Sequence, residues 1–285
     1  MTVVAPPGRL PDFVLIGTMK SGSTTVFRWL EQHPAVQLPA VKEPNFFSDD
    51  QRWQRGVEWY ARHFEGVPAD VVTGEASVRY TDPRKSAVAA HRLRETVPGA
   101  RLICVLRNPV DRMRSHFRHE VQRGRERRRF ADAVLLPDSN YVLRSCYATA
   151  LRPWVDLSPQ DQLLVVTSER LLSEDAEWMR LLGFLDLDPL PRPTTMHNVT
   201  SDKASFSPLM RLLWDTGLVQ RLPRGPRIAR RLGRRLFLRP PARTADLLDS
   251  AQDSVPAPVV ERLQRETEQL RAMFPDLDPE WDVRA

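Results

Sequence analysis

Cysteine is scarce in this 285-residue sequence, and long apolar runs are missing from it. Its two cysteines, Cys104 and Cys146, make neither a disulfide framework nor a zinc site, and such scarcity suits a reducing cytoplasm. No window approaches the roughly 18 uncharged apolar residues of a membrane span. The first residues also lack the basic segment and apolar core of a secretion signal. We therefore expect a folded cytoplasmic protein without a membrane span, in which both cysteines are structural.

Charge of one sign is present in excess. The chain has 42 Lys and Arg against 36 Asp and Glu, a net charge of +6, which suits nucleic acid, an anionic membrane surface or an anionic small ligand. Residues 218–244 hold no acidic side chain and carry arginine at positions 221, 224, 227, 230, 231, 234, 235, 239 and 243. Because no interleaved aromatics and no helix-turn-helix, zinc-finger or RNA-recognition pattern accompany them, nucleic acid is not the expected partner.

Short β-rich apolar runs alternate with helical patterns, as in a parallel sheet covered by helices. The expected strands are Phe13–Gly17, Val71–Gly74, Arg101–Leu106 and Leu163–Thr167. After a turn that follows the first strand, a helix is expected through Val26 and Leu30 to about His33, and further helices are expected over about 109–123, 168–182 and 258–274. The run at 101–106 is apolar enough to be buried on both faces, so it is expected at the centre. The predicted fold class is α/β, a P-loop-like three-layer αβα arrangement with a central parallel sheet flanked by helices.

The alternation fails between about residues 205 and 256, where prolines and arginine runs replace it. Within this segment Ile228, Leu232 and Leu236 recur every four residues, which favours one short amphipathic helix with an arginine-rich outer face. We expect one domain over residues 1–285, with a Pro/Arg-rich lid or excursion at about 205–256.

The turn after the first expected strand reads Gly17-Thr18-Met19-Lys20-Ser21-Gly22-Ser23-Thr24-Thr25, close to the G-x-x-x-x-G-K-[ST] loop that cradles phosphates. A nucleotide triphosphatase would have lysine after the second glycine, but Ser23 stands there and the lysine lies earlier, at Lys20. Small residues let backbone N–H groups approach an anion, and the helix N-terminus adds to the attraction. The loop predicts a phosphate site. The alternative is a tight strand-to-helix turn with a solvated lysine.

A second anion site is expected where the strand at 101–106 ends in Arg107-Asn108-Pro109, with Ser115 on the helix that follows. Ligands of open α/β sheets lie beyond the carboxyl ends of the strands, so Arg107 and the loop at 17–25 would face one crevice. An aspartate at this strand end would suggest Mg²⁺, whereas arginine suggests a second phosphate and requires no metal. The alternative for Arg107 is an ion pair with a nearby acid such as Asp111.

These motifs, in this order, resemble those of the sulfotransferases that use 3′-phosphoadenosine 5′-phosphosulfate (PAPS), most closely their bacterial and heparan-type branch. Residues 11–24 resemble the family's 5′-phosphosulfate loop, and Arg107 with Ser115 resembles its 3′-phosphate site. The segment Lys42-Glu43-Pro44-Asn45-Phe46-Phe47 is similar to the one in which heparan-type enzymes keep a catalytic glutamate, which corresponds to Glu43. The likeness covers residues 11–190, including Arg144-Ser145-x-Tyr147, Trp154 and Glu169-Arg170-Leu171-Leu172.

The resemblance implies a role for each motif. Lys20 would contact the 5′-phosphate and the bridging oxygen of the leaving nucleotide, and Glu43 would be the general base that deprotonates an acceptor hydroxyl. The donor nucleotide would be held by Lys20, Ser21, Gly22, Ser23, Thr24, Thr25, Arg107 and Ser115. PAPS would be the co-substrate, with no metal required. The acceptor would be a small-molecule, carrier-bound, glycan or lipid-like hydroxyl compound.

The sequence departs from the heparan-type pattern in one place that bears on the acceptor. Gly74-Glu75-Ala76-Ser77 stands where those enzymes have Glu-Lys-Thr-Pro, so Ala76 replaces the second active-site lysine and heparan is not the expected acceptor. His197, Asn198 and Lys203 are candidates for the loop that closes over the 3′-phosphate in the family.

Two other functions stay open from the sequence. One is a P-loop kinase or ATPase, which Mg²⁺ dependence and ATP binding would reveal; the displaced Lys20 argues against it. The other is binding of nucleic acid or anionic lipid through the arginines at 221–243. A structural or surface role is expected for the histidines, although none is excluded as a base; they are His33, His63, His91, His116, His119 and His197. The aromatic residues at 53–64 are expected in the core.

Overall fold

The computed structural model describes residues 8–194, 242–277, 279 and 281–283. Its strands are β1 (Phe13–Gly17), β2 (Gly74–Ala76), β3 (Arg101–Leu106) and β4 (Leu163–Thr167). Its α-helices are α1 (Ser23–Leu30), α2 (Asp50–Trp53), α3 (Gly56–Ala61), α4 (Ser86–Thr96), α5 (Pro109–Gln122), α6 (Phe130–Val134), α7 (Asn140–Leu143), α8 (Tyr147–Leu157), α9 (Ser168–Ser173), α10 (Asp175–Phe184), α13 (Ala242–Asp249) and α14 (Ala257–Met273).

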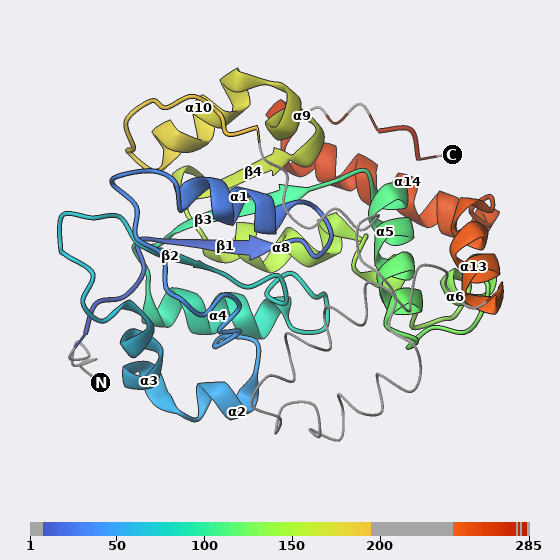
Figure 1. Ribbon diagram of the computed structural model, residues 1–285, viewed down its shortest axis with the longest axis horizontal. Coiled ribbons are helices and arrows are strands. Elements are labelled where there is room, and N and C mark those ends of the chain that lie inside the picture. Colours follow the sequence, from blue (N-terminus) through green and yellow to red (C-terminus); the bar gives the residue numbers. More distant parts are fainter. Residues whose placement is uncertain (1–7, 195–241, 278, 280, 284–285) are drawn as a thin grey trace, which may run out of the picture.

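The four strands form one parallel sheet in the order β2-β1-β3-β4 (Figure 1). Leu15 of β1 is paired with Ala76 on one side and with Ile103 of β3 on the other. On the far side of β3, Cys104 is paired with Val165 of β4. The central position predicted for the apolar run at 101–106 is confirmed, because β3 lies between two strands and is buried along its length apart from its first residue.

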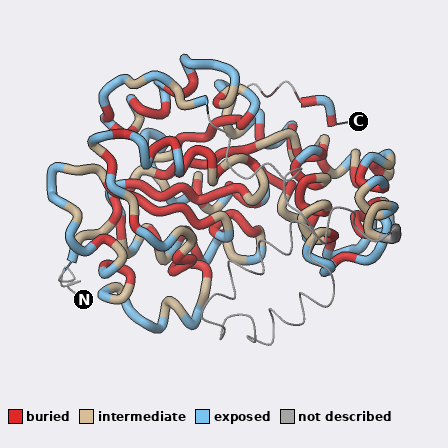
Figure 2. The backbone as a smooth tube through the Cα atoms, in the orientation of Figure 1, coloured by how far each residue is buried: buried red, intermediate tan, exposed pale blue. Residues whose placement is uncertain are grey.

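Side chains alternate between the two faces of the sheet, as the two-residue period of a strand requires. Phe13 and Leu15 pack in a cluster with residues of α1, α9 and α10, whereas Val14 and Ile16 pack in another with residues of α4, α5, α8 and α14. Figure 2 shows the buried sheet between these two helical layers, whose outer sides are exposed. The predicted α/β fold, three layers with a central parallel sheet, is therefore confirmed.

The second strand lies further along the chain than the sequence predicts. Val72 makes only an isolated bridge to Val36, and the pairing with β1 begins at Gly74. A Cβ at Gly74 would lie 2.5 Å from the Phe13 ring, so a residue without a side chain is needed where the two strands meet. The apolar run at 71–72 led the prediction away from a short edge strand that contains a glutamate.

The helix predicted at 168–182 is two helices, because Glu174 takes an extended conformation with φ −112 and ψ 121. Of the residues predicted for its apolar stripe, Met179 is 37% exposed, while the adjacent Trp178 is buried. Helix α1 ends at Leu30 rather than near His33. The helices predicted at 109–123 and 258–274 are confirmed as α5 and α14 to within about a residue, a difference within the usual uncertainty of helix ends.

Most of the predicted lid, residues 205–241, lies outside the described residues, as do His197, Asn198 and Lys203. The part that follows forms α13, which packs against α5, and a turn in which Ser250 accepts a hydrogen bond from the Phe130 N–H at 3.1 Å. The organisation of residues 1–285 as one domain with a lid stays a prediction.

Candidate functional site

The turn between β1 and α1 carries the predicted phosphate loop. Gly22 is the N-cap of α1 and has a φ of 90°, a left-handed conformation that glycine adopts without strain. Gly22 has no side chain with which to cap this helix, and its carbonyl accepts from the N–H of Thr25 at 2.8 Å. The positive end of the helix dipole at this turn attracts an anion. Ser21, Ser23 and Thr25 are buried, while Lys20, Gly22 and Thr24 are partly exposed. The loop thus presents donors at a helix N-terminus.

The phosphate loop is attached to the carboxyl end of β3. The N–H of Thr18 donates to the carbonyl of Val105 at 2.8 Å, and the Thr18 hydroxyl donates to the same carbonyl at 3.1 Å. The Tyr147 hydroxyl donates to the carbonyl of Arg107 at 2.8 Å, and it is also within hydrogen-bonding range of Ser21. The structure therefore brings together the two loops in which the sequence predicts anion sites.

Arg107 and Ser115 occupy the end of β3 and the helix that follows. Asn108 caps α5 by accepting from the N–H groups of Val110 and Asp111 at 2.9 and 3.3 Å, which sets the direction of the helix. Arg107 is 37% exposed, and its Nη2 lies 3.8 Å from Asp111 Oδ2. An exposed pair at this distance contributes little, so it leaves the guanidinium able to bind another anion. Ser115 lies on the buried side of α5.

The sequence reasoning did not single out Arg112 as a binding residue. Its guanidinium is fully buried, and it donates to the Ser145 hydroxyl at 2.7 Å and to the Tyr141 carbonyl. Burial lowers the pKa of Arg112 to about 10, with Arg144 and Arg107 contributing in the same direction. The helical period could have found this residue, because it places Arg112 on the same side of α5 as Ser115.

Positive charge converges on this part of the molecule. Burial, followed by the charges of Arg112, Arg144, His119 and Lys20, lowers the pKa of His116 to about 2, so its ring is neutral. Arg144 Nη2 forms an ion pair with Asp82 at 2.7 Å, and Arg144 Nη1 lies 3.1 Å from the Met19 sulfur in the phosphate loop. The charge beside the loop is thus predominantly cationic.

Three buried nitrogen atoms near the loop have no hydrogen-bond partner in the part of the chain that the structure describes: Arg112 Nη1, Arg144 Nε and His116 Nδ1. Unsatisfied buried polar atoms are uncommon in native proteins and often mark a place where a ligand binds. Together with the N-terminus of α1, these atoms fit a multiply charged anion such as a nucleotide.

Glu43 lies on the segment between α1 and α2. Its N–H donates to the carbonyl of Ala76 at 3.1 Å, and Ala76 is paired with Leu15 of β1, two residues before the phosphate loop begins. The Glu43 side chain is 37% exposed, and its Oε1 lies 3.1 Å from Lys42 Nζ. The structure therefore places this carboxylate at the same edge of the sheet as the loop, accessible to a substrate.

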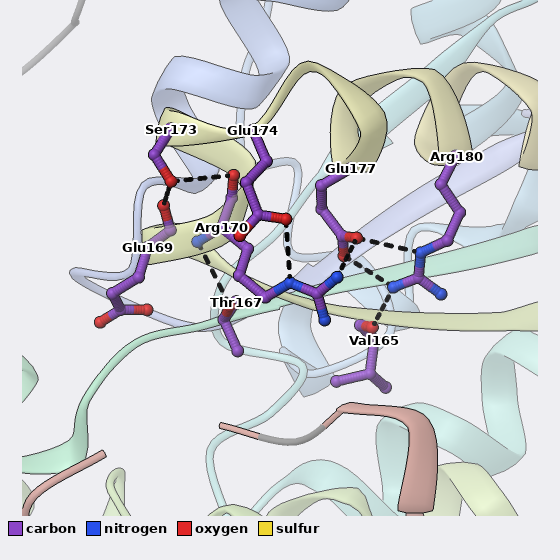
Figure 3. Close-up of polar contacts among 8 residues, drawn as sticks. All are labelled: Val165, Thr167, Glu169, Arg170, Ser173, Glu174, Glu177 and Arg180. Carbon is purple, nitrogen blue, oxygen red and sulfur yellow. Dashed lines mark hydrogen bonds and ion pairs between the residues drawn. The ribbon is translucent and has the colours of Figure 1, made fainter. Parts of the chain in front are cut away.

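The junction of β4 and α9 also contacts this edge. The Glu169 carboxylate accepts from the N–H of Asn108 at 2.8 Å, next to Arg107. Figure 3 shows that the neighbouring Arg170 and Arg180 are directed instead toward Glu177, a buried residue of α10. Glu169 thus supports the turn after β3, whereas the other three side chains form an ion-pair network of their own.

The other residues weighed in the sequence have ordinary structural surroundings. Tyr60 and Phe64 are fully buried, with Trp53 and Trp59 packed against the same cluster, so the expectation of a core role is confirmed. His33 Nε2 lies 3.0 Å from the Asp188 carbonyl oxygen. Both cysteines are buried and free.

The described residues hold neither a candidate membrane span nor a candidate metal site. None of the helices there has the length and apolar character that a membrane span requires. Within the same residues, no group of three or more His, Cys, Asp and Glu side chains is suited to hold a metal ion.

Comparison with known families gives one match that spans most of the chain. Residues 10–207 match the family model described as the sulfotransferase domain.

Curated relatives include the bifunctional heparan sulfate N-deacetylase/N-sulfotransferase 2 of Bos taurus, which is 30% identical over 68% of this chain. The matched region is 24% of that protein's length, so the chain corresponds to about a quarter of it. The heparan sulfate glucosamine 3-O-sulfotransferase 5 of Mus musculus is 26% identical, over 64% of this chain and 55% of its own length.

Among solved structures, a sulfotransferase from Alicyclobacillus acidocaldarius superposes with a TM-score of 0.58. It is 25% identical, and the match covers 77% of this chain and 96% of that one.

Proposed function

Because this chain belongs to the sulfotransferase family, we propose that it transfers the sulfuryl group of PAPS to a hydroxyl group of an acceptor. Sulfuryl transfer from PAPS is the general reaction of this family. One observation carries the proposal: the phosphate loop after β1 and the Arg107 turn after β3 are joined at one edge of the sheet. Two anion sites at one edge suit a nucleotide with phosphates at both its 5′ and 3′ positions.

The donor would be held by the residues of these two loops. Lys20 and residues 21–25 supply charge, hydroxyls and helix N–H groups for the 5′-phosphosulfate, and Lys20 would stabilise the charge that develops on the bridging oxygen. Arg107 and Ser115 would hold the 3′-phosphate. The buried Arg112, with an unpartnered Nη1, adds positive charge beside them. PAPS bound there supplies the activated sulfuryl group.

Glu43 is our candidate for the general base. Its carboxylate is partly exposed at the edge that carries the phosphate loop, so an acceptor hydroxyl can reach it. A carboxylate that accepts the acceptor's proton as the new S–O bond forms typically accelerates such a step by ~10²–10⁴-fold. His116 is a poorer candidate, because its lowered pKa and burial leave it a very weak base.

The acceptor we propose is a small-molecule or carrier-bound hydroxyl compound in the cytoplasm, in a biosynthetic setting. Ala76, which replaces the second lysine of the heparan-type pattern, is fully buried in β2 and supplies no cation to a polyanionic glycan. The two unpaired cysteines suit a reducing compartment. A screen with a phenol, an aliphatic alcohol and a glucosamine oligosaccharide tests this proposal, and preference for the oligosaccharide would contradict it.

The donor site is tested without knowing the acceptor, by calorimetric titration with 3′-phosphoadenosine 5′-phosphate (PAP). We expect wild-type protein to bind PAP and Arg107→Ala to bind it about 10–100-fold more weakly, because a charge-assisted hydrogen bond contributes about 1.5–3 kcal/mol. Arg101→Ala is the matched control, since Arg101 begins the same strand at the opposite edge of the sheet. Its affinity for PAP should be unchanged.

ATP with Mg²⁺ as competitor distinguishes the alternative. Indifference of PAP binding to ATP and Mg²⁺ supports the sulfotransferase. Absence of PAP binding, or preference for ATP with Mg²⁺, would overturn it in favour of a P-loop kinase or ATPase.

A further inference from the structure

A fully buried carboxyl group lies in β2, directly behind the segment that carries Glu43. Glu75 accepts hydrogen bonds from three hydroxyl groups: Tyr80 at 2.6 Å and Tyr60 at 3.3 Å on Oε1, and Ser77 at 2.7 Å on Oε2. All four of these residues are completely shielded from solvent. A buried carboxyl group is costly unless its oxygens are satisfied, and here three donors converge on it.

Two of these hydroxyl groups also hold the segment at 43–47. The Asn45 N–H donates to Ser77 Oγ at 3.0 Å, and the Phe47 N–H is 3.4 Å from the Tyr80 hydroxyl oxygen. A hydroxyl has one proton, so the Ser77 proton that points to Glu75 leaves an oxygen lone pair facing Asn45. The carboxyl group therefore sets the orientation in which both hydroxyls accept from the segment.

The segment needs such support because its backbone is unusual. Glu43 has a φ of 63° and Asn45 a φ of 48°, left-handed values that are uncommon for residues other than glycine. The Asn45 side chain donates to the Glu43 carbonyl at 2.9 Å, and Arg52 Nη1 donates to the same carbonyl at 3.1 Å, so Asn45 is one of two residues that hold Glu43. The Glu43 N–H is in turn bonded to Ala76, between Glu75 and Ser77.

We infer that Glu75 is a positioning residue for the reaction: through Ser77 and Tyr80 it holds the segment at 43–47 so that the Glu43 carboxylate faces the acceptor. This inference rests on the proposed function, because it assigns Glu43 as the base. Glu75 contacts no substrate. Its effect is on the placement of Glu43, where a displacement of about 1 Å can cost about 10²-fold in rate.

Two matched variants separate positioning from a general contribution to folding. Ser77→Ala and Tyr60→Phe each remove one hydroxyl donor from Glu75, but only Ser77 also accepts from the segment, at Asn45. We expect Ser77→Ala to lower kcat by about 10-fold or more while the KM for PAPS and the Kd for PAP change less than about twofold. Tyr60→Phe should leave kcat within about twofold.

Turnover is measured as PAP released from PAPS, with 4-nitrophenol, a glucosamine oligosaccharide and water as probe acceptors. Glu75→Gln is the second variant, because an amide keeps the shape of the side chain while one of its ends becomes a donor. That donor opposes the Ser77 or tyrosine protons, so the same fall in kcat at constant PAP affinity is expected. Thermal unfolding of every variant shows that the fall does not follow the folded fraction.

Amide hydrogen exchange tests the link without any acceptor. In Ser77→Ala, the Asn45 and Glu43 N–H groups should exchange faster, while those of β3 are unchanged. Unchanged exchange at both groups would overturn the inference whatever the turnover.

The two hypotheses fail in different ways. Full activity of Glu43→Gln would remove the assigned base, and the inference with it. Equal kcat losses in Ser77→Ala and Tyr60→Phe, or full activity of Ser77→Ala beside an inactive Glu43→Gln, would overturn the inference alone.

Discussion

Glu75 in β2 and Glu177 in α10 are both buried carboxyl groups, with 0% and 3% of the residue exposed, but their partners differ. Glu177 accepts from Arg180 at 2.7 Å and lies 3.5 Å from Arg170 Nη2 (Figure 3). Glu75 accepts instead from the hydroxyl groups of two tyrosines and a serine. The charge of Glu177 is compensated by guanidinium groups, whereas Glu75 is bound by uncharged hydroxyl donors.

The difference shows that a buried carboxyl group can be stabilised with or without compensation of its charge. Guanidinium partners compensate the charge of Glu177, and the network joins α9 to α10 and, through a hydrogen bond from Arg180 to the Val165 carbonyl, to β4. Hydroxyl partners leave the charge of Glu75 uncompensated. Burial therefore raises the pKa of Glu75 to about 7, although the three hydroxyls oppose the shift, and the nearby Glu43 adds to it. Glu75 accepts hydrogen bonds from Ser77 and Tyr80, and these two residues in turn accept from the segment that carries Glu43, the candidate base.

The largest expected effect is on turnover, which should fall when Glu43 is substituted but not when Glu177 is substituted. Glu43→Gln, on the side of Glu75, should lower sulfuryl transfer by ~10²–10⁴-fold because the base is lost. Glu177→Gln should leave the rate within about twofold, because its network does not reach the reacting groups. PAP release and PAP calorimetry measure both. Loss of turnover in Glu177→Gln at full stability would contradict the comparison.

A smaller effect is expected in the pH dependence of stability. Folding raises the pKa of Glu75 from 4.5 to about 7, so between these values the folded protein retains a proton that the unfolded chain has released. This contribution is fully present below about pH 4.5 and is lost as the pH rises to about 7, a change of about 3 kcal/mol. Urea unfolding across this range should show the slope in the wild type and in Glu177→Gln. Its persistence in Glu75→Gln would exclude Glu75 as the source.

Removing a guanidinium tests the other side of the comparison. Arg180→Ala leaves Glu177 with the more distant Arg170 and removes a hydrogen bond to the Val165 carbonyl. Because Arg180 is 45% exposed, solvent limits the loss, and we expect about 1–2 kcal/mol of unfolding free energy. Arg28→Ala, which breaks an exposed pair with Glu31, is the control and should change stability by less than about 0.5 kcal/mol. Affinity for PAP should change in neither variant.

The smallest expected effect is a difference between the two tyrosine partners of Glu75. Each phenol hydroxyl lowers the Glu75 pKa by donating to it, and the Tyr80 bond of 2.6 Å contributes more than the Tyr60 bond of 3.3 Å. Tyr80→Phe should therefore raise this pKa more than Tyr60→Phe. Titration of the Glu75 carboxyl ¹³C resonance measures both shifts, and the reverse order would show that these distances do not govern the pKa.

Local patterns predicted the elements that local forces determine. Apolar runs were sufficient to predict β1, β3 and β4, because strands buried on both faces consist of consecutive apolar residues. The start of α5 was predicted from Asn108-Pro109, because these residue types are typical of a helix N-terminus. The phosphate loop and Arg107 were found for the same reason, since glycine, hydroxyls and a strand-end arginine lie next to each other in the chain. The edge strand β2 was misplaced, because only its pairing with β1 distinguishes it from the apolar residues before it.

The sequence by itself determined the strands β1, β3 and β4, the long helices α5 and α14, and the glycine- and hydroxyl-rich turn after β1, because these depend on neighbours within a few positions. The tertiary structure alone decided that Glu75 is buried and that Ser77 and Tyr80 connect it to the segment of Glu43. These contacts join residues that are 32 and 33 positions apart in the sequence. No sequence period or motif indicates these contacts, because they form only when the segment at 43–47 lies against the end of β2.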